Sequence, residues 1–152
     1  MANTAERIER VVGAGAVRSI SKLVTYTDIN TPAVTSVNVV IGQIHPTAEA
    51  VVPYAVLNVI ELFSGSTDLT AAIGSGATPD LLLVDTNVMA VPNPVPTIVP
   101  QNPVPACNEV FLSGTDVIAR FTSSVADLNL LTRGQVQVVV QFWIPADSVE
   151  AI

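Results

Sequence analysis

The carboxyl-terminal part of the sequence alternates between two kinds of side chain, and this alternation limits the possible folds more than any other feature. Over residues 135–143, one set of alternate positions is entirely apolar: Val136, Val138, Val140 and Phe142. The positions between them are uncharged and mostly amides: Gln135, Gln137, Val139, Gln141 and Trp143. Because successive side chains of a strand point to opposite faces, this period of two predicts a β-strand with one face in the core.

The other face of the same strand is unusual for a surface in contact with solvent, because it is rich in amides and has no charge. Glutamine amides both donate and accept hydrogen bonds, so they can pair across a subunit contact. We therefore expect a subunit interface at Gln135, Gln137, Gln141 and Trp143. The alternative is that these side chains are simply solvated.

The rest of the chain also has strand-like segments, separated by turns rich in Gly, Pro and Asn. We expect strands at residues 21–28, 35–41, 55–63, 69–73, 81–84, 109–112 and 116–122. Short β-branched and aromatic runs at roughly even spacing are typical of a sandwich, and no apolar stripe has the helical period of 3.6. The sequence predicts an all-β protein with a single β-sandwich, jelly-roll-like in topology.

The chain has few charges for its size, with 12% charged and 49% hydrophobic residues over 152 positions. A typical soluble domain has about 25% charged residues, so much of this surface is neutral. Residues 55–63 are apolar on both faces apart from Asn58 and Glu61, which suits a strand covered on both sides. Neutral and apolar surface favours association, so we expect a homo-oligomer.

The charges are unevenly distributed along the chain. Four of the six basic residues lie near the amino terminus: Arg7, Arg10, Arg18 and Lys22. We expect residues 1–20 to form an arm that docks on an acidic protein surface, ahead of a sandwich domain at residues 21–152; the alternative is a solvated tail. The remainder is strongly acidic, so nucleic acid and anionic membranes are not expected partners.

Prolines are concentrated in residues 92–105, which lie inside the sandwich domain. This segment contains six of the eleven prolines: Pro92, Pro94, Pro96, Pro100, Pro103 and Pro105. Such a run favours an extended polyproline II conformation. It suits a strap over a neighbouring subunit or a crossover between sheets better than a ligand for a proline-recognition module.

The residues needed for common catalytic chemistries are scarce. His45 is the one histidine and Cys107 the one cysteine, so no multi-histidine or multi-cysteine metal site can form within the chain. No nucleophile elbow or phosphate-binding loop is present, and the aspartates are scattered near predicted turns, where they ordinarily cap backbone amides. We therefore expect no enzyme activity, no catalytic residues, no cofactor and no metal.

The order of the segments resembles small accessory proteins encoded among the virion genes of tailed bacteriophages. The matching stretches are LVTYTDINT at 23–31, VIGQIHPTAEAVVPYAVLNVIELFSG at 40–65, LTAAIGSG at 69–76 and GTDVIARFTSSVADLNLLTRGQVQVVVQFW at 114–143. In that group, a strand of the type DIIATFTS is followed by a loop, LTAG and a closing alternating strand. The corresponding turn here is Leu131 to Gly134.

This resemblance implies a jelly-roll-like cement, decoration or head-fibre-type subunit, often a trimer, that clamps neighbouring capsid proteins. The expected partners are further copies of the chain and the major capsid protein, at the surface of a phage head and after synthesis in the host cytoplasm. The basic residues at positions 7, 10, 18 and 22 would then contact the capsid. The alternatives are another virion component, such as a tail, neck or head fibre, and a carbohydrate-binding or receptor-binding sandwich.

Overall fold

The computed structural model describes residues 17–44, 50–90, 97–100 and 109–144. The strands are β1 (Val17–Thr25), β2 (Ser36–Gln43), β3 (Ala50–Ser64), β4 (Thr70–Ser75), β5 (Leu83–Asn87), β6 (Thr97–Pro100), β7 (Glu109–Phe111), β8 (Asp116–Thr122) and β9 (Arg133–Trp143). Two short helical segments join them, the α-helix α2 (Tyr26–Ile29) and the 3-10 helix η1 (Leu128–Leu130). In this part of the chain, neither helix is long enough to cross a membrane.

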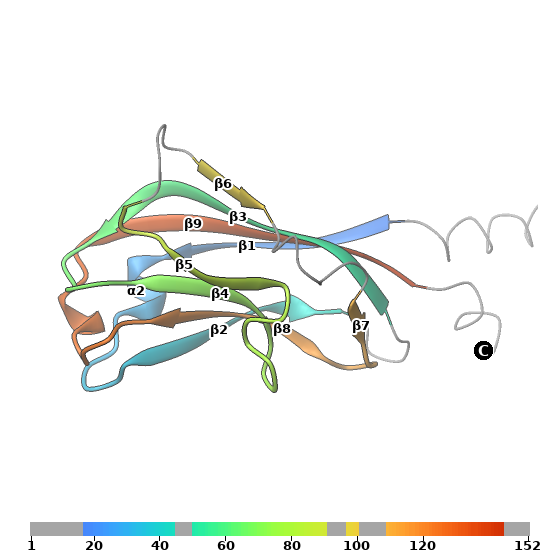
Figure 1. Ribbon diagram of the computed structural model, residues 1–152, viewed down its shortest axis with the longest axis horizontal. Coiled ribbons are helices and arrows are strands. Elements are labelled where there is room, and N and C mark those ends of the chain that lie inside the picture. Colours follow the sequence, from blue (N-terminus) through green and yellow to red (C-terminus); the bar gives the residue numbers. More distant parts are fainter. Residues whose placement is uncertain (1–16, 45–49, 91–96, 101–108, 145–152) are drawn as a thin grey trace, which may run out of the picture.

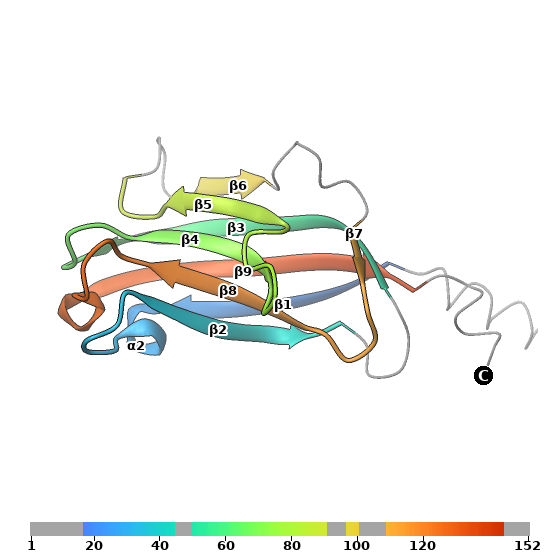
Figure 2. The same ribbon diagram turned by 60° about the horizontal axis from the view of Figure 1, so that its bottom comes forward.

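The strands form two antiparallel sheets that pack face to face, as Figures 1 and 2 show. One sheet has the order β1-β9-β3-β6, with β7 also paired to β3, and the other has the order β2-β8-β4-β5. The pairs are nested, because β1 pairs with β9, β2 with β8, β3 with β6 and β4 with β5. Such a doubled-back chain wrapped into two sheets is a jelly roll, so the predicted all-β sandwich is confirmed.

Strand β9 lies between β1 and β3 and contributes the most regular part of the core. Val136, Val138 and Val140 are fully buried, and Phe142 is nearly so. The residues between them are exposed or half-buried, which confirms the alternation predicted from the sequence. The register places Val24 opposite Val136 and Ile20 opposite Val140, so the inward face continues onto β1.

The core lies between the two sheets and is made almost entirely of aliphatic side chains. Phe63 of the first sheet and Phe121 of the second meet in it, with ring centroids 6.0 Å apart and ring planes inclined by 46°. Offset or tilted aromatic pairs of this kind favour contact between a ring edge and a ring face. The second sheet also contributes inward-facing Val117 and Ala119, both fully buried.

The chain departs from the expected strand at residues 26–28. These residues belong to helix α2, because the backbone N–H of Thr25 donates a hydrogen bond of 2.8 Å to the Asp28 carboxylate. This contact satisfies a donor at the start of the helix and turns the chain away from β1. Ile29 then enters the core, where it is fully buried.

Two other segments differ from the expected organisation. Strand β1 begins at Val17, so residues 17–20 of the predicted arm are part of the first sheet. Within the predicted proline-rich strap, residues 97–100 form strand β6 and pair with β3. Proline is tolerated there because an edge strand does not need every N–H for pairing. The remainder of both predicted segments, 1–16, 91–96 and 101–108, lies outside the described residues.

Candidate functional site

The outer face of the first sheet is a broad surface without charge across its centre. Cross-strand register aligns the outward side chains of β1, β9 and β3 in rows. One row is Leu23–Gln137–Asn58, the next is Ser21–Val139–Val56, and Ser19 pairs with Gln141 beyond them. We call these eight residues the neutral face. Toward one end of it, the charged side chains of Glu61 and Arg133 follow.

The neutral face combines apolar and amide groups of different exposure, and Val56 on β3 is buried, with 6% of its surface exposed. Leu23 is 48% exposed at its margin, while Gln137 and Val139 are half-buried in its middle. Ile60, 38% exposed, lies beside it where the β3–β9 register shifts. The buried Asn58 Oδ1 has no hydrogen-bond partner among the described residues.

The predicted interface residues therefore lie on one surface. Gln135, Gln137, Gln141 and Trp143 all point away from the core on β9, and each is exposed or half-buried. The sequence reasoning missed the contributions of β1 and β3, because the register between strands far apart in the chain has no local signal.

Of the four predicted basic contact residues, Arg18 and Lys22 lie within the described structure. Arg18 and Lys22 lie on β1, not in an arm, and their register partners on β9 are the inward-facing Phe142 and Val138. At this sheet edge both side chains reach solvent, and Lys22 Nζ donates a 3.1 Å hydrogen bond to the Val40 carbonyl of β2. Lys22 thus joins the two sheets across the open side of the sandwich. Arg7 and Arg10 lie outside the described residues.

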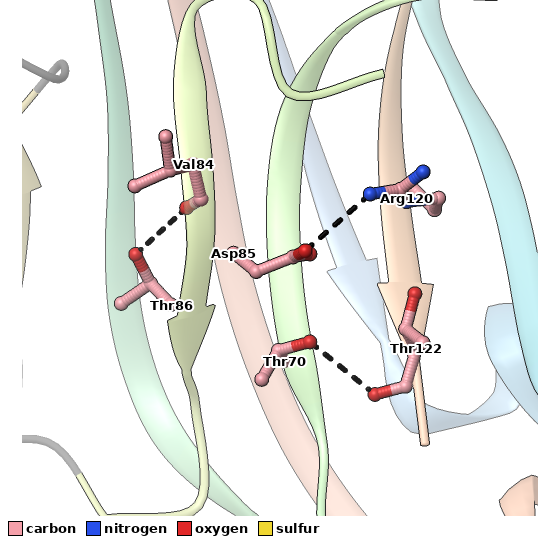
Figure 3. A network of polar contacts seen from close by, with 6 residues as sticks. All are labelled: Thr70, Val84, Asp85, Thr86, Arg120 and Thr122. Carbon is pink, nitrogen blue, oxygen red and sulfur yellow. Dashed lines mark hydrogen bonds and ion pairs between the residues drawn. The ribbon is translucent and has the colours of Figure 1, made fainter. Parts of the chain in front are cut away.

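The outer face of the second sheet has a different character, with charges and hydroxyls held in a network (Figure 3). Asp85 of β5 reaches across β4 to Arg120 of β8, and their charged groups are 3.4 Å apart. Thr70 donates a hydrogen bond of 3.4 Å to the Thr122 carbonyl on the neighbouring strand. Arg120 lies directly opposite Ala72 in the register, where a small side chain leaves room for the ion pair above it.

Two aspartates join the β3–β4 loop to the β8–β9 loop at one end of the sandwich. Asp68 Oδ1 accepts hydrogen bonds of 2.8 Å from Ser124 N–H and from the Ser123 hydroxyl. Asp127 Oδ2 accepts hydrogen bonds of 2.7 Å from both the N–H and the hydroxyl of Thr67, and its Oδ1 lies 2.8 Å from the Ser123 hydroxyl. These aspartates cap backbone amides, as the sequence predicted.

The same hydrogen bonds keep both carboxyl groups ionised. The backbone N–H of Ser124, with help from the Ser123 hydroxyl, holds the pKa of Asp68 below its usual value. The Thr67 hydroxyl, followed by the Thr67 N–H, lowers the pKa of Asp127. Each group accepts bonds that favour its charged form, which outweighs the cost of partial desolvation. The two aspartates therefore hold the β3–β4 loop and the β8–β9 loop together, and we call this hydrogen-bonded cluster around Asp68 and Asp127 the clasp.

A shallow hollow of about 470 Å³ lies where the β4–β5 loop approaches the β7–β8 loop. Its lining among the described residues is mainly apolar, including Leu81, Phe111, Leu112 and Ile118, and Asp116 is the one titratable side chain in that lining. Such a lining could receive an apolar side chain but brings no second titratable group for acid–base chemistry. Among the described residues, no group of three His, Cys, Asp or Glu side chains could hold a metal ion. His45 and Cys107 lie outside those residues.

The fold, a jelly roll with one uncharged outer face, is similar to chains in two bacteriophage capsid structures. A chain of the cyanophage Pam1 capsid asymmetric unit matches with a TM-score of 0.62 and 16% identity, over 87% of this chain and 87% of that chain. A chain in the acid-stable capsid of Helicobacter pylori bacteriophage KHP30 matches with a TM-score of 0.41 and 10% identity, over 86% of this chain and 94% of that chain.

The Pam1 likeness agrees with the jelly-roll-like fold that the sequence resemblance implied. At this identity it shows a common fold. No family model matches the sequence. No curated protein matches it either.

Proposed function

We propose that this protein is a non-enzymatic structural subunit of a phage virion, and more specifically a cement or decoration protein on the head surface. The observation that carries the proposal is the likeness to a chain of the Pam1 capsid asymmetric unit, which extends over 87% of both chains. A match of nearly full length means that the two proteins share a whole architecture and not only one sheet motif. The low charge of this chain is a second, independent support, because neutral surface favours burial against partners.

In the proposed role, the protein stabilises a shell mechanically. It binds across the junctions between major capsid proteins, so that separating them requires exposing apolar surface that its sandwich had covered. Copies associate with one another, with a trimer preferred. The basic residues contribute to docking on the acidic surface of the shell: Arg7, Arg10, Arg18 and Lys22. Of these, Lys22 has an additional internal contact with Val40.

The test is an electron cryomicroscopy reconstruction of the particle that contains this protein. We expect jelly-roll density on the outside of the head, in contact with more than one capsid subunit. Density at the neck, on the tail or in a fibre would overturn the cement role while keeping the virion role. Absence of the protein from purified particles would overturn both.

A further inference from the structure

The charge of the chain limits how two copies can approach each other. The formal net charge is −7 at pH 7, so identical copies repel one another at long range. The exposed acids among the described residues are distributed over several elements: Asp28, Glu61, Asp80, Asp85 and Asp116. Contact through most surfaces would therefore bring carboxylates of two copies together.

The neutral face avoids this penalty. Its three cross-strand rows contain only hydroxyl, amide and aliphatic side chains, and they extend over β1, β9 and β3. The opposite outer face, in contrast, contains the Arg120–Asp85 ion pair. A contact centred on the neutral face therefore brings no like charges directly together. Association through this face avoids the short-range repulsion between carboxylates of the two copies.

We propose that a second copy of this chain binds to the neutral face, with Leu23 as the apolar contact and Gln137 as the hydrogen-bonding contact. This inference rests on the proposed role as an oligomeric virion subunit. Contact between two identical faces joins copies in pairs, so it predicts a twofold contact in place of the trimer preferred above. Amides suit association between identical surfaces, because each Gln or Asn both donates and accepts and so finds a complementary group on the other copy. Leu23, 48% exposed, provides apolar area that association removes from water.

A pair of matched substitutions tests the proposal. Leu23 and Val40 are both 48% exposed and lie on the edge strands β1 and β2, but on the outer faces of opposite sheets. Leu23→Glu introduces a charge into the neutral face, and Val40→Glu introduces the same charge elsewhere. Because each side chain is already half in water, neither change should unfold the protein, and circular dichroism would verify this.

Mass measured by light scattering across a dilution series gives the result. We expect Leu23→Glu to raise the dissociation constant of the oligomer at least about tenfold, because like charges then face each other across the contact. Gln137→Glu should act in the same direction, while Val40→Glu should leave the dissociation constant within about twofold of the wild-type value. A monomeric wild type, or equal effects of Leu23→Glu and Val40→Glu, would overturn the inference.

Failure of this inference and failure of the cement role give different results. If Leu23→Glu stays fully oligomeric yet the protein is found on the head, the neutral face is not the contact between copies and the cement role stands. If the Leu23→Glu variant dissociates while the Val40→Glu variant stays oligomeric, but no density is found on the head, the contact between copies stands and the cement role fails.

Discussion

The ring of Phe63 occupies the space that a side chain on Gly134 would need. A Cβ atom at position 134 would overlap both the Phe63 ring and its backbone. Gly134 also has a φ of +135°, a conformation that side-chain-bearing residues rarely adopt. The start of β9 therefore packs directly against the end of β3. On β3, the Phe63 ring also pairs with Phe121 in the core.

Gly134→Ala should therefore destabilise the fold severely. Backbone strain and forced displacement of Phe63 together should lower the free energy of unfolding by roughly 2–5 kcal/mol. Gly76→Ala is the matched control, because an added Cβ there meets nothing within 4 Å. Urea denaturation of both variants checks the prediction, and equal midpoints would show that position 134 tolerates a side chain.

Acid should loosen the end of the sandwich held by Asp68 and Asp127. Hydrogen bonds lower the pKa of both carboxyl groups in the folded state. A lowered folded-state pKa gives stability that is fully present above the unfolded-state value of about 3.9 and is lost as pH falls through the folded values. Thermal denaturation between pH 7 and pH 2 should show a loss of stability that begins near pH 4 and deepens below it.

Asn substitutions should isolate that effect. Asp127→Asn should lower stability at pH 7 and flatten the dependence on pH below 4, because the amide cannot titrate and one of its polar atoms cannot accept from Thr67. Asp80→Asn is the control, since Asp80 is exposed in the β4–β5 loop. An acid profile of Asp127→Asn that matches the wild-type profile would show that the clasp does not contribute to stability.

The fold was predictable from the sequence largely because its strands have local signals. The alternation over 135–143 identified β9 and its inward face, and the turn residues separated the other strands. Helix α2 was missed because Tyr26 and Thr27 favour strands, and one hydrogen bond from Thr25 to Asp28 outweighs that preference. Strand β6 was missed because the prolines of the surrounding segment 92–105 suggested an extended strap, while pairing with β3 depends on the rest of the sheet.

The candidate site was predictable only in part. The sequence identified the outward residues of β9, since alternation within one strand is a local property. It did not identify Leu23 or Asn58 as their neighbours, because that requires the register of β1 and β3 against β9. It named Lys22 as a capsid contact residue but gave no sign of its hydrogen bond to the Val40 carbonyl of β2, which depends on how the two sheets pack.

Deletion of residues 1–16 should weaken docking without harming the fold. The described sandwich begins at Val17, so this deletion removes no residue of any described strand but takes away Arg7 and Arg10. We expect unchanged thermal stability and reduced occupancy on particles. Added salt should weaken docking of the full-length chain more than docking of the truncated one, since screening shortens the range of charge attraction to about 10 Å at 0.1 M. Unchanged occupancy would mean that these residues do not contribute to docking.

The stability of particles that lack the protein tests the cement role most directly. Packaged DNA presses outward on the shell, so particles assembled without this subunit should form normally but release DNA at a lower temperature or under milder osmotic shock than wild-type particles. Addition of the purified protein should restore the wild-type release temperature. Particles that are as robust as wild type but fail to adsorb to cells would contradict the account and favour a receptor-binding role instead.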